Sequence, residues 1–450
     1  MSAWRREKSS GQTLGTTLFA LIAIAMVIVL TLAPGWGRKS AQQNSTKKPV
    51  EIWDWNIAAM SLDSLIPKFS AQHPDINVFV TRNGTAIESR LLLSLAANTG
   101  APDITALQDT QTPRFTETKR LLDLTSRAEK YKSDFPAAAW NLCMSDGKLY
   151  AMPWDIGPCA IFYRRSIFKQ YNIDPDTIKT WDDYIAVGVR LRDESHGTIQ
   201  MLPLSAADLI PSFEIWMQQN AGSIFDAQGR LILCSPQNVE VLAMMRKMLD
   251  AKITASFKIF SPEYFGSFAS GKVASFPIAA WIMQDIKDYA PATAGDWGLF
   301  PLPAFRPGGI RVSNLGGSTL AIPAQCPNPD AAWEFIQYAM CTVPSQVAIY
   351  RDYGIFPAYL PALKDPFFDE PVPFFGNQKV NRLFATDIDK IPPLVYNSDW
   401  ADAERILREH LGHWADSKED SREMLRDAQN EMARKFDRQI APQAEGAADR

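Results

Sequence analysis

The chain has few of the residues on which most catalytic and metal sites depend. Its 450 residues include only 4 histidines and 5 cysteines. It also lacks the Gly-x-Ser-x-Gly motif of hydrolases, the phosphate-binding P-loop and the His-Glu-x-x-His motif of zinc proteases. His410 and His413 lie one helical turn apart, but on a charged helical face such a pair is more often solvated than bound to metal. We therefore predict no enzymatic activity, no metal and no cofactor.

The cysteines do not form an obvious disulfide framework, because their number is odd and the chain is long. Cys143 and Cys159 flank the stretch around Trp154 and could meet across it. A single disulfide between these two residues is one hypothesis, and two free thiols are the other.

An excess of positive charge is also lacking. The formal net charge is −4, although residues 1–40 alone hold five basic residues and one acidic residue. The rest of the chain therefore holds 41 basic and 49 acidic residues. A nucleic-acid partner would need clustered Lys and Arg, so the composition argues against one.

The sequence has one long uncharged and mainly apolar run, from Leu14 to Ala33. It is long enough to span a hydrocarbon core of roughly 30 Å, and a basic segment (residues 1–13) precedes it. Pro34 should hinder cleavage directly after Ala33, so we predict a signal or transmembrane anchor over 14–33 that is retained rather than removed. Residues 34–49 are then a flexible linker, and the body works on the extracytoplasmic face of a bacterial cell membrane.

After this linker, strand and helix patterns alternate along the chain. The strand patterns occupy residues 50–55, 76–80 and 102–107. This order predicts an open α/β sheet, and the length of the chain predicts two lobes rather than one core. In such sheets ligands bind beyond the carboxyl ends of the strands, which draws attention to residues 54–56, 108–110 and 154–155.

The stretch from Asp146 to Arg165 is the most informative part of the chain. Leu149 to Met152 and Ala160 to Tyr163 each have a strand pattern, while prolines and a glycine between them disfavour a continuous element. We therefore expect two short strands that flank an irregular segment with Trp154 and Asp155. An aromatic ring and a carboxylate at such a crossing are typical of the hinge of a two-lobed binding protein.

Four segments resemble the extracytoplasmic solute-binding proteins of ABC importers, in the sugar-binding class of the maltose-binding protein family. They are Val50 to Val80; Pro102-Asp103-Ile104-Thr105; Asp146 to Ile167 with Thr180-Trp181-Asp182-Asp183; and Phe268 to Trp281 with Pro301-Leu302-Pro303, Gly316-Gly317 and Asn328 to Tyr338. Arg164-Arg165 replace the Asn-Lys that is usual in the family, and Lys179 stands where Pro is common. The order and spacing of the segments carry the resemblance over residues 50–340, and residues after 360 match only by position.

The resemblance implies a periplasmic-binding-protein-like fold, in which two α/β lobes are joined by crossing strands and close like a hinge on a ligand in the cleft between them. The implied N-lobe is residues 50–156 and 314–362. The implied C-lobe is residues 157–313 and 363–440, and residues 441–450 are a disordered tail. The implied function is that of a receptor that binds a mono- or oligosaccharide and delivers it to the permease subunits of an ABC transporter.

Two criteria identify candidate ligand-binding residues: a position beyond the end of a predicted strand, and a match to a binding position of the family that the chain resembles. Sugars stack on aromatic rings, and their hydroxyls bind carboxylates and amides. Trp281 occupies the position of a stacking tryptophan in related sugar binders, and Trp400 has a similar positional match. The other candidates lie beyond strand ends or in the Gly-Gly signal: Trp55, Asn56, Gln108, Asp109, Trp154, Asp155 and Gly317.

Three alternatives stay open at this point. A retained anchor would also suit a sensor subunit that presents ligand to a membrane receptor. The same fold could bind a solute other than a sugar. Asp109 and Asp155 could also be read as the paired carboxylates of a glycoside-acting enzyme, which need a defined separation that sequence does not give.

Overall fold

The computed structural model of the chain describes residues 47–417 and 419–442. Of these, residues 49–417 and 419–442 belong to one compact unit. The predicted anchor at 14–33 and most of the predicted tail lie outside the described residues. Across the ranges that are described, no helix combines the length and the hydrophobicity that crossing a bilayer requires.

A seven-stranded mixed sheet runs through the described part of the chain. Its strands are β1 (Lys48–Asp54), β2 (Ile76–Arg82), β3 (Ile104–Gln108), β6 (Ala151–Arg164), β9 (Ser275–Ala279), β10 (Trp297–Pro301) and β11 (Asn314–Ala321). Their order is β10-β6-β11-β3-β1-β2, and β9 pairs with β6 as well. Short pairs stand apart from this sheet: β4 (Met144–Ser145) with β5 (Lys148–Leu149), and β7 (Leu202–Pro203) with β8 (Thr254–Ala255).

The first part of the chain forms the predicted alternating sheet. β1 and β3 are parallel, and α2 (Asn56–Gln72) and α3 (Ile87–Ala97) connect the strands. β3 is buried over Ile104–Leu107 because helices cover both faces of a parallel sheet. The later strand β11 then pairs with β3 in the antiparallel direction, so the sheet is mixed.

The expectation of two short strands around an irregular segment with Trp154 and Asp155 is wrong. β6 is a single strand of 14 residues that runs through this segment. Its two halves have different partners: residues 151–158 pair with β11, whereas residues 159–163 pair with β9 and residues 160–164 with β10. The strand stays continuous through its prolines because it changes neighbours at the crossing. Gly157 permits this change, since a Cβ there would lie 2.0 Å from the Leu315 carbonyl oxygen.

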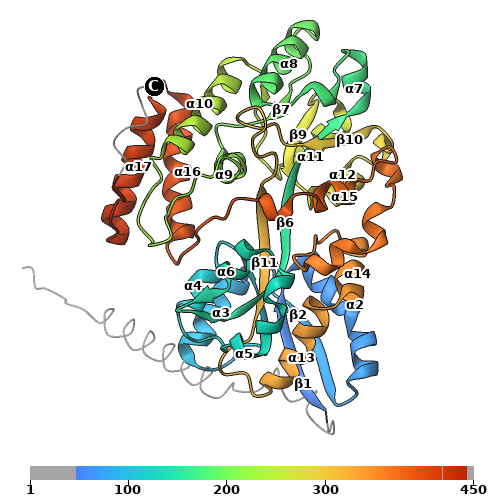
Figure 1. The fold of residues 1–450 in the computed structure, drawn as a ribbon, viewed down its shortest axis with the longest axis vertical. Helices are drawn as coiled ribbons and strands as arrows, with labels where there is room; N and C mark the ends of the chain where they lie inside the picture. The colour runs from blue at the N-terminus through green and yellow to red at the C-terminus, as the bar shows by residue number, and fades with distance from the viewer. Residues whose placement is uncertain (1–46, 418, 443–450) are drawn as a thin grey trace, which may run out of the picture. The chain divides into compact units, whose positions relative to one another are not determined.

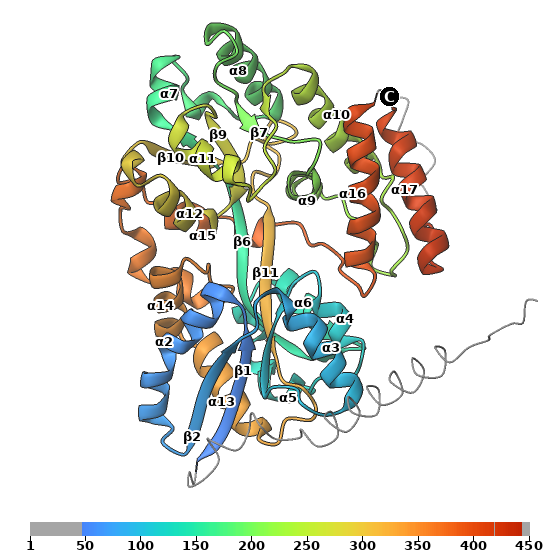
Figure 2. The same cartoon turned by 180° about the vertical axis from the view of Figure 1, so that it is seen from behind.

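β6 and β11 connect two groups of helices, as both views show (Figures 1 and 2). We use N-lobe for the group around β1–β3 and C-lobe for the group around β9 and β10. The N-lobe holds α2, α3, α4 (Thr112–Thr116), α5 (Thr125–Ala128), α6 (Ala137–Leu142), α13 (Pro329–Met340) and α14 (Val343–Tyr353). The C-lobe holds α7 (Arg165–Gln170), α8 (Trp181–Glu194), α9 (Ile210–Gln219), α10 (Pro236–Asp250), α11 (Pro262–Ser270), α12 (Ile282–Tyr289), α15 (Val380–Ala385), α16 (Trp400–Asp416) and α17 (Ser421–Phe436).

Several helices begin where local sequence signals place their caps. Thr180 and Asp183 form a capping box at the start of α8, and Ser261 accepts a hydrogen bond from the Tyr264 backbone N–H at the start of α11. The proline-rich region from 357 to 393 contains mainly short 3₁₀ turns, together with α15. The 3₁₀ turns within the described residues are Gly84–Ala86, Glu129–Asp134, Pro175–Thr177, Pro291–Thr293, Leu360–Lys364, Pro366–Asp369, Pro373–Phe375 and Ile388–Lys390 (η8).

All five cysteines are free thiols, and each is buried. The hypothesis of a disulfide between Cys143 and Cys159 is therefore wrong. The Cys143 thiol donates to the Ala139 carbonyl within α6, whereas the Cys159 thiol donates to the Gly157 carbonyl at the crossing. Each thiol thus has a local partner in its own segment.

Candidate functional site

A cavity of about 420 Å³ lies where the two lobes meet, and we call it the cleft cavity. Asp109, Phe135 and α6 line it from the N-lobe, and Gln218 of α9 lines it from the C-lobe. Ile156 of β6 and Asn314 of β11 line it from the crossing strands. The segment from Ile388 to Tyr396 also contributes to its wall. Its volume is in the range of about 300–1,000 Å³ that is usual for small-molecule sites.

Asp109 follows β3 and lies against β11. Its backbone N–H donates to the Gly317 carbonyl at 3.0 Å, and its side chain folds over that glycine. A Cβ on Gly317 would lie 2.2 Å from Asp109 Oδ2, and the φ of Gly317 is +138°. Only glycine leaves room for the carboxylate there. Asp109 is 7% exposed, and no donor from the described residues hydrogen-bonds to its carboxylate.

Two further carboxylates belong to the same group of acids. Asp155 interacts electrostatically with Asp109 and also with Asp54. Asp155 of β6 accepts a hydrogen bond from the Ser318 hydroxyl of β11. Asp54, at the end of β1, accepts a hydrogen bond from the Trp55 backbone N–H at 2.7 Å. The second oxygen of Asp54 is buried and has no partner among the residues that are described.

Burial dominates the electrostatics of these three acids. It raises the pKa of Asp109 well above the ordinary value, and the charge of Asp155 raises it further. Burial likewise raises the pKa of Asp54, with an added contribution from Asp155. The pKa of Asp155 rises to about 6 because it is desolvated, although its bond to Ser318 opposes the rise. The acids therefore take up protons more readily than exposed carboxylates.

Amide side chains connect the C-lobe wall to the crossing strands. Gln218 Nε2 donates to the Pro392 carbonyl at 2.9 Å, while its Oε1 accepts from the Asn314 backbone N–H at 3.1 Å. The Asn314 side chain accepts from the Gly157 N–H at 2.7 Å and donates to the Gly316 carbonyl. These bonds hold α9, β6 and β11 together at one edge of the cleft cavity.

Tyr396 lies between acidic groups of both lobes. Burial raises the pKa of its phenol, and the charges of Glu214 and Asp109 add to the effect. Glu214 is one helical turn before Gln218 on α9. Burial and the nearby Glu404 raise the pKa of Glu214 to about 8, and one of its oxygens is buried without a partner among the described residues.

An aromatic pair lies close to the same stretch of β11. The Trp281 indole N–H donates to the Leu315 carbonyl at 3.0 Å, and its ring is partly exposed. The Phe260 ring lies 5.5 Å from it with an angle of 33° between the planes. Phe260 is 56% exposed and has a φ of +65°, which is unusual for a bulky residue. Trp281 and Asp109 thus both contact residues 315–317, although Trp281 does not line the cleft cavity itself.

The remaining predicted residues divide into two groups. Gln108 is exposed at the end of β3, Asn56 is exposed as the first residue of α2, and Trp55 is half-buried. Trp154 and Trp400 are 1% and 0% exposed, so neither ring offers a face to a ligand in this conformation. Trp154 points to the opposite face of β6 from Asp155, because side chains alternate along a strand.

Trp400 contributes to the site indirectly, because it packs against Tyr396. Its ring lies 4.3 Å from that of Tyr396, and so it supports a residue of the cavity wall. Sequence reasoning missed Gln218, Asn314, Tyr396, Glu214 and Phe260. The one available signal was the polar pair Gln218-Gln219 within a helix that is otherwise mainly apolar.

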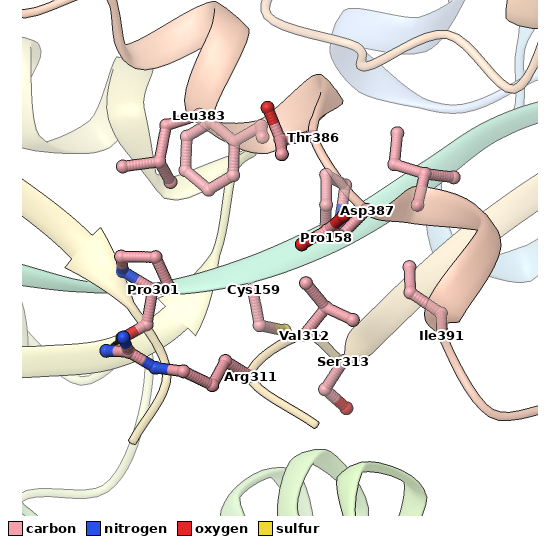
Figure 3. Close-up of a pocket in the computed structure, with 12 residues that line it drawn as sticks. Pro158, Cys159, Pro301, Arg311, Val312, Ser313, Leu383, Thr386, Asp387 and Ile391 are labelled. Carbon is pink, nitrogen blue, oxygen red and sulfur yellow. Dashed lines mark hydrogen bonds between the residues drawn. The ribbon is translucent and has the colours of Figure 1, made fainter. Parts of the chain in front are cut away.

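A second cavity, of about 280 Å³, lies at the crossing strands, and we call it the hinge cavity. It shares Ile388 and Ile391 with the cleft cavity. Figure 3 shows Pro158 and Cys159 of β6, Val312 and Ser313 before β11, and the segment from Leu383 to Ile391 around it. Arg311 also lines it and donates to the carbonyls of Leu302, Ile178 and Pro301.

Two of the four histidines, His73 and His410, lie beside a glutamate carboxylate. His410 Nε2 lies 3.0 Å from Glu431 Oε2, which connects α16 to α17. Within residues 47–417 and 419–442, no group of three or more His, Cys, Asp or Glu side chains is placed to hold a metal ion.

The family model for bacterial extracellular solute-binding proteins matches residues 58–340, which is more than half of the chain. The chain belongs to this family. It is a family of solute-binding proteins rather than of enzymes, and membership places the binding body outside the cytoplasm. The match also agrees with the resemblance that the sequence motifs indicated.

Curated relatives of this solute-binding protein carry the names of sugar receptors. The arabinooligosaccharide-binding protein of Bacillus subtilis is 27% identical over 86% of this chain and 91% of its own length. The lactose-binding protein of Rhizobium radiobacter is 25% identical over 77% and 83%.

Solved structures share the two-lobed α/β fold. The galacto-N-biose/lacto-N-biose I-binding protein of an ABC transporter from Bifidobacterium longum superposes with a TM-score of 0.75 at 20% identity, over 89% of this chain and all of that one. A binding protein from B. animalis subsp. lactis, in complex with β-1,6-galactobiose, has a TM-score of 0.71 at 24% identity over 88% of this chain and all of its own.

Proposed function

We propose that this solute-binding protein is the carbohydrate receptor of an ABC importer. The observation that carries the proposal is a cavity lined from both lobes, into which the buried Asp109 presents a carboxylate without a protein partner. Because Asp109 lines the cavity, donors on a ligand can complete its hydrogen bonds there in place of water. Sugar hydroxyls supply donors of this kind, and the names of the curated relatives support the same ligand class.

The roles of individual residues follow from their positions. Asp109 and Asp155 would accept hydrogen bonds from hydroxyls, and Gly317 would give Asp109 its room. Trp281, with Phe260, would stack on a sugar ring at the edge of the cleft. Asn56 and Gln108, which are exposed, would contact the ligand at the rim when the lobes close.

Delivery would depend on closure of the lobes about the crossing strands β6 and β11. A ligand that contacts Asp109 on one wall and Gln218 on the other stabilises the closed state more than the open state. The permease subunits would then distinguish a loaded receptor from an empty one. We propose that residues 14–33 anchor the receptor to the membrane, and the N-terminal mass of the mature protein and its partition into the membrane fraction would test this.

A thermal-shift screen against a panel of sugars tests the proposed function. A ligand at 100 times its dissociation constant should stabilise the folded protein by about 2.7 kcal/mol. Arabino-oligosaccharides, lactose and galactobiose belong in the panel with other neutral di- and trisaccharides. Saturable binding with recovery of the unchanged sugar would support a receptor, whereas no shift with any sugar would overturn the proposal.

A further inference from the structure

The charged side chains around the cleft cavity are acidic. Asp109 and Asp389 are the charged residues that line it, within the described part of the chain, and no Lys, Arg or His lines it. Two further acids lie behind this wall: Asp155 is close enough to raise the pKa of Asp109, and Glu214 is close enough to raise the pKa of Tyr396. The lining therefore offers carboxyl groups and no base, so an anionic ligand would find no counter-charge among the described residues.

Nearby cations are already held by other groups. The Arg408 guanidinium donates to Asp208 at 2.7 Å and to Glu404 at 2.6 Å, so its charge is shared by two carboxylates in addition to Glu214. Lys390 lies 2.7 Å from the Asp387 carboxylate, on the turn η8. Neither base is placed to neutralise Asp109.

Asp109 is the buried acidic residue that a ligand in the cleft cavity would contact directly. It is more than nine-tenths buried, it lines the cavity, and none of the residues that are described donates to its carboxylate. Gly317 fixes its position, because only glycine accommodates Oδ2 over β11. A ligand that donates a hydroxyl or ammonium hydrogen would complete its hydrogen bonds. A ligand carboxylate or phosphate would instead bring a second negative charge into a poorly solvated site.

We infer that the cleft selects its ligands by charge: it accepts glycans that present hydroxyl or ammonium donors to Asp109, and it rejects uronates and sugar phosphates. This inference rests on the proposed function and narrows its ligand class. Repulsion between unit charges a few ångströms apart near a protein surface is strong enough to weaken binding by a factor of about 100 or more.

Calorimetry with matched sugar pairs tests the inference. The probes are neutral di- and trisaccharides, each paired with the uronate that differs only in having carboxylates at C6, such as α-1,4-galactobiose and α-1,4-digalacturonate, which has one on each ring. We expect every binder in the panel to be uncharged or cationic, and the uronate of the tightest neutral binder to bind at least about 100-fold more weakly. A uronate that binds as tightly as its neutral partner would overturn the inference and leave the receptor function intact. A panel without any binder would count against the receptor function and, with it, against the inference.

Two further measurements locate the source of the discrimination. At a pH high enough to ionise Asp109, whose pKa is raised by burial, the Asp109→Asn variant should lower the ratio of neutral to uronate affinity by about tenfold or more, since the buried charge is then gone. Asp250→Asn removes the same charge from an exposed position on α10 and should leave the ratio unchanged.

In the unmodified protein, raising NaCl to 0.5 M should alter the ratio by less than about threefold, because salt screens buried charges poorly. A ratio that is unaffected by Asp109→Asn, or that disappears in salt, would contradict a filter in the cleft. The salt series keeps the test valid even if the variant does not fold.

Discussion

The two cavities that share Ile388 and Ile391 differ in how their polar groups are satisfied. In the hinge cavity, Arg311 donates to three backbone carbonyls, and the Ser313 hydroxyl donates to the Ile215 carbonyl at 2.6 Å. In the cleft cavity, Asp109 has no donor from the described residues. The cavities are thus adjacent, and they differ in that the cleft cavity is lined by a carboxylate to which no described residue donates.

The difference indicates which cavity is built for a ligand. A polar group that is bonded within the protein stabilises the fold, and a ligand could replace its bonds only at a cost. A buried group without a partner destabilises the unliganded protein and gains most when a ligand arrives. This contrast predicts that changes at the hinge cavity alter stability, whereas changes at the cleft cavity alter affinity.

The largest effect should come from Gly317→Ala. The new Cβ would lie 2.2 Å from Asp109 Oδ2, so the carboxylate must leave its position, and the φ of +138° adds strain. We expect affinity for the best sugar in the panel to fall by about 100-fold or more, measured by calorimetry. Gly308→Ala is the matched control, because its φ of +75° also favours glycine while no atom lies within 4 Å of the added Cβ. Equal losses of affinity in the two variants would remove the special role of Asp109.

Arg311→Met should show the opposite behaviour. It leaves three carbonyls of the C-lobe without their donor, so we expect a loss of about 2–4 kcal/mol in the free energy of unfolding. Affinity should change by less than about threefold. Arg306→Met is the control: its pair with Glu240 is exposed and should contribute at most about 1 kcal/mol. A large loss of affinity in Arg311→Met would show that the two cavities are not separable in this way.

Asp109→Asn should raise stability while it weakens binding. Removing a buried carboxylate that has no partner is expected to increase the free energy of unfolding at pH 7 by about 1–2 kcal/mol. Chemical denaturation of the unliganded protein, beside the Asp250→Asn control, would measure this. A decrease in stability would mean that the carboxylate does have a stabilising partner in solution.

The smallest effect concerns pH. The folded-state pKa of Asp155 is about 6, above the ordinary value of 3.8, so the folded protein holds this proton more tightly than the unfolded chain does. Its contribution to stability is therefore present at low pH and is lost as pH rises through about 6. Between pH 5.5 and 7.5 the unliganded protein should lose about 1 kcal/mol from this group. The charged groups that face it, Asp54 and Asp109, should change stability in the same direction.

Asp155→Asn should flatten this dependence, as followed by thermal unfolding across the same pH range. A slope that stays the same in the variant would assign the effect to Asp54 and Asp109 instead. Stability that rises with pH would contradict the raised pKa values.

Local signals predicted the parts of the fold that local interactions determine. The starts of α8 and α11 are examples, because the hydroxyls of Thr180 and Ser261 lie within a few residues of the helical N–H groups that they cap. The continuity of β6 was missed, since it depends on partners far away in the chain: β11 for one half, β9 and β10 for the other.

For the candidate site, whose ligand contacts remain a proposal, local and distant signals divide in the same way. Positions after strands identified Asp109 and Asp155, and a Gly-Gly signal identified Gly317. The burial of Trp154 and Trp400 depends on how the lobes pack, which no spacing along the chain reveals. Gln218 and Tyr396 come from a helix and a loop of the C-lobe, and only the folded chain brings them to the same cavity as Asp109.

The place of β11 in the sheet has a consequence for the order of folding. Residues 49–156 leave the ribosome first, but their sheet lacks the strand between β3 and β6 until residue 321 has been synthesised. During that interval the open edges of β3 and β6 can pair with the wrong strands. The nascent chain should therefore rely on a holding chaperone until its C-terminal half has emerged, and truncation before residue 314 should yield aggregates instead of an isolated domain.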